Sequence, residues 1–144
     1  LFALPPVVPD AKARFEAAGM ADRVTITPGS FRDQALPSGA DAVSLIRVLY
    51  DHSDDTVRAL LARVYDALPA GGRLIISEPM GGGARPERAG DVYFAFYTMA
   101  MQTGRARSAA EIEALARGAG FTQIQSPTPA RAYVTRVLTA VRAH

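Results

Sequence analysis

The sequence of residues 41–55 is DAVSLIRVLYDHSDD, and this stretch decides the fold class. It begins as an apolar run rich in Val, Ile and Leu, and then changes abruptly to polar and ionisable side chains. This pattern is typical of a buried parallel strand that delivers side chains to a site at its carboxyl end. Residues 54–68 follow with apolar side chains at helical spacing, and Ser53 can cap that helix. Strand, polar turn and helix together indicate an open α/β sheet.

Length and composition favour one globular α/β unit, or part of one. The chain has 144 residues, of which 49% are hydrophobic, so it can bury one core of ordinary size. Its 16 basic and 14 acidic residues are spread along the chain, which argues against a nucleic-acid partner. The absence of cysteine and the presence of only two histidines exclude thiolate chemistry and a Cys- or His-rich metal site.

The sequence predicts no transmembrane segment. The longest apolar run, residues 92–101, is short of the roughly 20 residues that a spanning helix needs. No charged region precedes an apolar segment at the N-terminus, so a secretory signal is not indicated. We therefore expect a cytoplasmic protein, and peripheral contact with a membrane is left open.

The other elements are predicted from local patterns. Strands are expected at residues 1–4, 23–27, 73–77, 121–125 and 133–141. Helices are expected at residues 10–18, 91–102 and 109–117, with Asp10 capping the first and Ser108 the last. Pro28 and Gly29 should end the second strand, and Pro127 and Pro129 should lie in the last turn. Residues 80–90 are rich in glycine and are a candidate lid over a site.

The helix at residues 91–102 is apolar nearly all round, so we expect it to be covered on several sides. A core helix or a subunit interface would explain this composition. Alternatively, its aromatic and Met side chains line a pocket for a long apolar substrate.

The densest titratable cluster comprises Tyr50, Asp51, His52 and Asp54. Glu78 follows the next apolar strand, so the two strand ends should place these groups around one cleft. Simpler interpretations remain open: His52 as a surface or capping residue, and Asp54 and Asp55 as helix N-terminal charges. A carboxylate in the position of Glu78 is costly to bury without a partner or a role. Residues 81–83 are glycines, but no phosphate-binding helix follows them.

Residues 45–54, LIRVLYDHSD, resemble the L-x-x-V-L-H-D-W-S-D segment of the plant-type S-adenosylmethionine-dependent O-methyltransferases. Residues 2–5 resemble the family's F-D-L-P, residues 68–74 its L-x-P-G-G-x-L, and residues 117–121 its x-x-A-G-F. Residues 79–86 and 90–97 are most similar to the bacterial carotenoid branch, the demethylspheroidene (hydroxyneurosporene) O-methyltransferases. The resemblance implies a Rossmann-like class I methyltransferase sheet, mostly parallel with an antiparallel last strand.

The resemblance also implies a function and a site. The cofactor would be S-adenosyl-L-methionine, and the acceptor a hydroxyl of an apolar carotenoid. The implied catalytic residues are Tyr50 and Glu78. The implied cofactor-binding residues are Ser30, Phe31, Arg47, Asp51 and His52. The implied substrate-binding residues are Tyr93, Phe94, Tyr97 and Met99.

The chain departs from the family pattern at several of its functional positions. The family's ribose-binding Asp falls on Ala3, its adenine-side Asp on Ser30, its general-base His on Tyr50, its adenine-facing Trp on His52 and its second acid on Ala106. Two alternatives therefore stay open: a methyltransferase acting on a tetrapyrrole or aromatic polyketide, and a non-catalytic α/β module with a decayed site.

The resemblance implies that residues 1–144 are the C-terminal part of the cofactor-binding catalytic domain. The first strand, its glycine turn and the helical domain that forms a homodimer would precede them. Without that central strand, we expect the isolated residues to aggregate or stay molten, because buried sheet edges would lack partners.

Overall fold

The structure is a computed structural model that describes residues 1–128 and 135–144. The chain forms two compact units, Leu1–Ser38 and Gly39–His144. The sequence predicts one continuous unit instead. The difference arises because, among the described residues, the strands of the first unit pair only with each other and form a separate two-stranded sheet.

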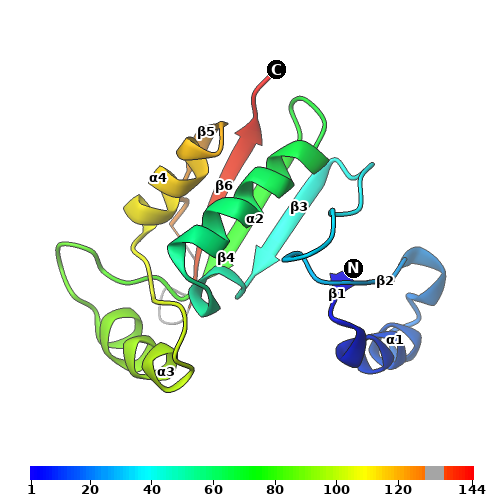
Figure 1. The fold of residues 1–144 in the computed structure, drawn as a ribbon, viewed down its shortest axis with the longest axis horizontal. Coiled ribbons are helices and arrows are strands. Elements are labelled where there is room, and N and C mark those ends of the chain that lie inside the picture. The colour runs from blue at the N-terminus through cyan, green and yellow to red at the C-terminus, as the bar shows by residue number, and fades with distance from the viewer. Residues whose placement is uncertain (129–134) are drawn as a thin grey trace. The chain divides into compact units, whose positions relative to one another are not determined.

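In the first unit, β1 (Phe2–Ala3) pairs in parallel with β2 (Thr27–Pro28), and α1 (Val8–Ala17) lies between them in sequence (Figure 1). The prediction that Asp10 caps this helix is wrong. The helix begins two residues earlier, with a proline in its first turn and no side-chain cap. Proline is tolerated there because the first backbone N–H groups of a helix need no intrahelical acceptor. Asp10 lies within the first turn, where its negative charge interacts favourably with the positive end of the helix dipole.

The predicted strand at residues 23–27 is also placed wrongly. Residues Ala21–Arg23 form a 3₁₀ turn, and only Thr27 and Pro28 pair with β1. Pro28 fits within the strand because the N–H groups on either side of it make the ladder bonds. Thr27 N donates to Leu1 O at 2.8 Å, and Gly29 N donates to Ala3 O at 2.8 Å. Proline therefore occupies the position whose N–H the ladder does not use.

The second unit is built on a sheet with the order β3-β4-β6-β5. Its strands are β3 (Ala42–Ile46), β4 (Arg73–Glu78), β5 (Phe121–Gln125) and β6 (Arg136–Arg142). Strands β3 and β4 are parallel, and β6 is antiparallel to both of its neighbours. The predicted Rossmann-like arrangement with an antiparallel last strand is confirmed. The predicted start of that strand at residue 133, and the turn residue Pro129, lie outside the described residues.

Helices α2 (Asp54–Ala67) and α4 (Ala109–Gly118) lie side by side over this sheet (Figure 1). Each begins at a predicted cap: Ser53 accepts from Thr56 N, and Ser108 forms a capping box with Glu111. The predicted apolar face of α2 is buried in full, and it comprises Val57, Leu60, Leu61, Val64 and the following Leu68. Burial of each such side chain stabilises the fold by about 1.5–3 kcal/mol.

The helix predicted at residues 91–102 has two parts, a π-helical stretch at Arg88–Tyr93 and α3 (Phe94–Ala100). The expectation that it is covered on several sides is wrong for the described part of the chain. Only Phe94 and Thr98 of α3 are buried, whereas the side chains of Phe96 and Met99 are 66% and 70% exposed. Periodicity predicts a helix but does not predict how much of it is covered.

Hydrogen bonds restrain part of the predicted lid segment, residues 80–90. Gly81 pairs with Ser108 in an isolated bridge, and the Asp91 carboxylate accepts from the N–H groups of Gly82 at 2.8 Å and Glu87 at 2.6 Å. Among the described residues, no helix is both long enough and apolar enough to cross a bilayer.

Candidate active site

The candidate site centres on residues 48–52, which connect β3 to α2 and are called the elbow below. Leu49–Asp51 form a 3₁₀ turn, and both Leu49 and Tyr50 are buried. The elbow begins one residue after Arg47, whose φ of 55° lies in the left-handed region. Such backbone is strained for a residue with a side chain and occurs often at functional sites.

Glu78, at the end of β4, accepts hydrogen bonds from backbone N–H groups of the elbow. Its carboxylate Oε1 accepts from Val48 N and Leu49 N, both at 2.8 Å, and Oε2 accepts from Tyr50 N at 3.4 Å. The side chain is 1% exposed. Burial raises the pKa of Glu78 above its ordinary value, and the three N–H donors oppose that rise. The expectation that Glu78 and the elbow meet at one edge of the sheet is confirmed.

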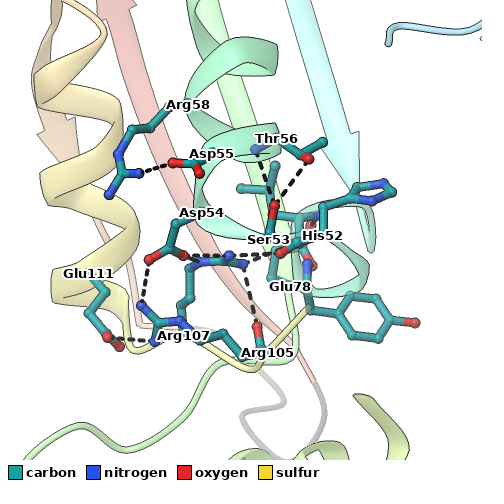
Figure 2. Close-up of polar contacts among 12 residues, drawn as sticks. His52, Ser53, Asp54, Asp55, Thr56, Arg58, Glu78, Arg105, Arg107 and Glu111 are labelled. Atoms are coloured by element: carbon teal, nitrogen blue, oxygen red, sulfur yellow. Dashed lines mark hydrogen bonds and ion pairs between the residues drawn. The ribbon is translucent and has the colours of Figure 1, made fainter. Parts of the chain in front are cut away.

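Arg107 holds the carbonyl side of the elbow. Its Nη1 donates to Leu49 O at 2.9 Å, and its Nη2 donates to His52 O at 2.8 Å. Its Nε donates to Asp54 Oδ1 at 2.8 Å (Figure 2). Sequence reasoning missed this residue. Its only local signal is its place directly before the helix cap Ser108, in a loop that has to return to the sheet edge.

Asp54 belongs to a network of ion pairs. Its carboxylate lies 2.6 Å from Arg107 Nη2 and 3.1 Å from Arg105 Nη2, and Arg105 also pairs with Glu111 (Figure 2). Hydrogen bonds from Arg105 and Arg107 lower the pKa of Asp54 below its ordinary value. Asp55 instead pairs with the exposed Arg58. These contacts favour a structural role for both acids.

Tyr50 lies in an aromatic cluster with α3. Its ring packs edge-on against Phe94 at 5.8 Å and lies 5.7 Å from the ring of Tyr97, centroid to centroid. The guanidinium carbon of Arg47 lies 5.8 Å from the Tyr50 ring and 5.9 Å from the Phe94 ring. Burial, together with a hydrogen bond to Tyr97, raises the pKa of the Tyr50 phenol, and Arg47 opposes that rise. The phenol is therefore protonated at neutral pH.

Asp51 carries a buried polar atom, Oδ1, without a hydrogen-bond partner among the described residues. Burial raises the pKa of Asp51, while the neighbouring His52 and Arg47 lower it. A buried acceptor without a donor is rare in folded proteins and is explained when a ligand supplies the donor.

The remaining predicted site residues lie in the first unit and in two hollows of the second unit. Ser30 and Phe31 follow β2 in the first unit, where Ser30 N donates to Gln34 Oε1 at 2.9 Å. Tyr93 and Tyr97 line an open hollow of about 690 Å³ on the π-helical stretch and α3, together with Arg88, Val92 and Phe96. Met99 lines a second hollow, and Ala106 also lines it. The second unit thus brings Arg47, Tyr50, Phe94 and Tyr97 together.

Known proteins are similar to this chain in sequence. Residues 1–122 match the family model of the O-methyltransferase domain. The chain belongs to this family. It is 58% identical over 142 residues to a demethylspheroidene O-methyltransferase from Cereibacter sphaeroides, covering 99% of this chain and 38% of that protein. It is 57% identical over 120 residues to the Rhodobacter capsulatus protein of the same name, covering 83% of this chain and 30% of the relative.

A solved structure supports the same assignment. Human N-acetylserotonin methyltransferase in complex with SAM superposes with a TM-score of 0.86 at 25% identity, covering 99% of this chain and 40% of the human chain. The chain spans less than half of the length of each of these three relatives. Its core fold is that of a class I methyltransferase.

Low pH should weaken the ion pairs that Asp54 forms with Arg105 and Arg107. Because the pKa of Asp54 is lowered in the folded state, its contribution to stability is present above the unfolded pKa of about 4 and is lost as the pH falls through the folded pKa. We expect Asp54→Asn to be less stable than the wild type at pH 7, and the difference to shrink toward pH 2–3. Urea unfolding at several pH values measures this difference.

Asp55→Asn is the matched control, because Asp55 lies in the same helical turn and its side chain is 95% exposed. It should change stability little at any of these pH values. A gap between Asp54→Asn and wild type that is as wide at pH 3 as at pH 7 would contradict the assigned ion pairs.

Proposed function

We propose that the protein transfers a methyl group from S-adenosyl-L-methionine to a hydroxyl of an apolar carotenoid similar to demethylspheroidene. The observation that carries this proposal is the 58% identity, over 99% of the chain, to a protein named demethylspheroidene O-methyltransferase. The aromatic side chains beside the elbow support it, because an apolar polyene needs an apolar contact surface.

The residues present fit the proposed cofactor. The buried, unpartnered Oδ1 of Asp51 is an acceptor for a donor group of a ligand. Arg47, His52, Ser30 and Phe31 are the other proposed cofactor residues. Bound S-adenosyl-L-methionine supplies an electrophilic methyl group on a sulfonium. The chain's own contribution is to bind it and to orient the acceptor hydroxyl toward it.

The proposed acceptor surface consists of Tyr93, Phe94, Tyr97 and Met99. Phe94 packs on Tyr50, whereas Tyr93 and Met99 are 65% and 70% exposed in the described chain. Phe94 and Tyr97 contact the Tyr50 ring, whereas Met99 lines a separate hollow. An acceptor that covers the proposed surface would gain about 25 cal/mol for each Å² of apolar surface removed from water.

Tyr50 and Glu78 have different proposed roles. Methyl transfer depends mainly on positioning, and well-oriented encounters supply about 7–11 kcal/mol. The raised pKa keeps the Tyr50 phenol protonated, so its proposed role is to orient the acceptor hydroxyl by hydrogen bonding. The proton of that hydroxyl would pass to water as the methyl group is transferred. Both oxygens of Glu78 accept from elbow N–H groups, so Glu78 acts by holding the backbone that carries Tyr50.

The protein as a whole is proposed to be larger than the chain described. Residues 1–144 would form the C-terminal part of the cofactor-binding catalytic domain, with a further N-terminal domain forming a homodimer. We propose a cytoplasmic location, with peripheral membrane contact giving access to an apolar acceptor.

Tyr50→Phe should lower turnover of the full-length protein by about 10²-fold, the loss expected when a reacting group is misplaced by about 1 Å. Cofactor affinity should change little, because the phenol itself is not among the proposed cofactor contacts. Turnover with radiolabelled cofactor and calorimetric binding measure the two quantities.

Tyr65→Phe is the matched control, since Tyr65 lies on α2 and packs on Phe121. It should leave turnover within about twofold. If Tyr50→Phe turned over as fast as the control, Tyr50 would be a packing residue only.

The proposed function is tested by cofactor binding and acceptor choice in the full-length protein. We expect S-adenosyl-L-methionine to bind, and a hydroxylated carotenoid in detergent to be methylated in preference to tetrapyrroles and aromatic polyketides. Preference for one of the other acceptors would reassign the substrate class. Absence of cofactor binding would favour the non-catalytic module.

A further inference from the structure

A single loop surrounds the carbonyl side of the elbow. Residues 103–107, called the clamp loop below, lie more than 50 residues after the elbow in sequence. Thr103 Oγ1 donates to Asp51 O at 2.9 Å, and Arg107 donates to Leu49 O and His52 O at 2.9 and 2.8 Å. The carbonyls of three elbow residues are therefore held from this loop.

Arg107 is buried for these contacts. Its side chain is 1% exposed, and a guanidinium is costly to bury unless its charge is paired and its donors are satisfied. Asp54 supplies the countercharge, and the elbow carbonyls accept the remaining donors that point toward them. A planar fork of five donors can serve these acceptors at once, whereas an ammonium group on a flexible stem cannot keep the same geometry.

Arg105 provides a natural comparison within the same loop. It pairs with the same Asp54 and with Glu111, but its side chain is 46% exposed, and in the described chain its hydrogen bonds go to these two acids and not to the elbow. The two arginines thus share a loop, a charge and an acidic partner. They differ in whether they hold the elbow backbone.

We propose that Arg107 is a positioning residue for methyl transfer, because its hold on the carbonyls of Leu49 and His52 fixes the main chain that carries Tyr50 and Asp51. The inference rests on the proposed function.

The hold of Arg107 complements that of Glu78. Glu78 binds the N–H groups of Val48, Leu49 and Tyr50, and Arg107 binds carbonyls on both sides of the Tyr50–Asp51 pair. Rotation of the backbone at Tyr50 or Asp51 would break bonds of both kinds. Because Asp54 neutralises Arg107, this hold places no unpaired buried charge beside the site.

Arg107→Lys and Arg105→Lys in the full-length protein test the proposal. Well below both melting temperatures, Arg107→Lys should lower kcat by about 10- to 100-fold, the effect expected of a misplacement near 1 Å, and weaken cofactor binding. Amide hydrogen exchange of a peptide containing residues 48–52 should become faster. Arg105→Lys should change kcat and exchange by less than about twofold.

A lower melting temperature for Arg107→Lys, with kcat, cofactor affinity and elbow exchange all at wild-type values below the transition, would overturn the proposal. Faster exchange with unchanged kinetics would overturn it too, because the hold would then be structural only. Should Arg107→Lys fail to fold, Thr103→Val removes only the bond to Asp51 O and should show smaller changes of the same sign. Wild-type values for Thr103→Val in that case would count against the proposal.

Failure of the proposed function and failure of the Arg107 inference give different results. A wild-type protein that transfers no methyl group contradicts the proposed function. An active wild type whose Arg107→Lys and Thr103→Val variants keep full turnover contradicts this inference alone.

Discussion

Glu78→Ala is expected to lower the free energy of unfolding by about 3–6 kcal/mol. The substitution leaves the N–H groups of Val48, Leu49 and Tyr50 without an acceptor, the first partly and the other two fully buried, and two of the three lost bonds are 2.8 Å long. Each buried donor left unsatisfied costs about 1–3 kcal/mol, and the most distant one should cost least. Urea unfolding of the full-length protein measures the change.

Glu78→Gln is the control for the charge of this side chain. Its amide oxygen can still accept from Val48 N and Leu49 N, so most of the stability should be retained. A loss below about 1 kcal/mol in Glu78→Ala would mean that water replaces the carboxylate and that Glu78 does not hold the elbow. Glu78 would then need another role, such as direct contact with a reacting group.

Gly104→Ala is expected to disrupt the elbow more than any other single methyl addition described. A Cβ at this position would lie 2.0 Å from Tyr50 O, 2.6 Å from Asp51 C and 2.8 Å from His52 N. The backbone cannot accept these contacts without moving, and a φ of +77° adds strain for any side chain. We expect turnover of the full-length protein to fall by about 10²-fold or more.

Two other glycines separate the causes of this effect. Gly39 has a φ of +91° and nothing within 4 Å of the added Cβ, so Gly39→Ala carries backbone strain of about 1–2 kcal/mol without a clash. Gly118, at the end of α4, has open space and no such φ, so Gly118→Ala should be nearly neutral. Turnover of Gly104→Ala equal to that of Gly39→Ala would show that the clamp loop yields freely and does not fix the elbow.

The local signals in the sequence were sufficient for the elements around the elbow. The position of β3, the Ser53 cap and the buried face of α2 are encoded within a few residues of one another and were predicted. The expected burial of β3 was wrong, because among its residues Leu45 alone is buried. Glu78 was also placed correctly, because parallel strands bring their carboxyl ends to one edge. The resemblance to the O-methyltransferases added the antiparallel last strand.

Contacts between distant residues could not be predicted in the same way. Arg107 reaches carbonyls 58 and 55 residues away, and no periodicity or cap relates these positions. The exposure of Phe96 and Met99 was missed because composition indicates an apolar helix but not the surface that covers it. Pro28 was misjudged because only the register of β1 and β2 shows that its missing N–H is not needed.

The most direct test of the central claim follows the methyl group itself. Full-length protein is incubated with cofactor carrying a trideuterated methyl group and with a hydroxylated carotenoid, and the products are examined by mass spectrometry. We predict that the label appears in one methyl ether on the carotenoid oxygen, at a rate that falls sharply in Tyr50→Phe. An unlabelled carotenoid, recovered with a protein that binds the cofactor and is fully folded, would contradict the account.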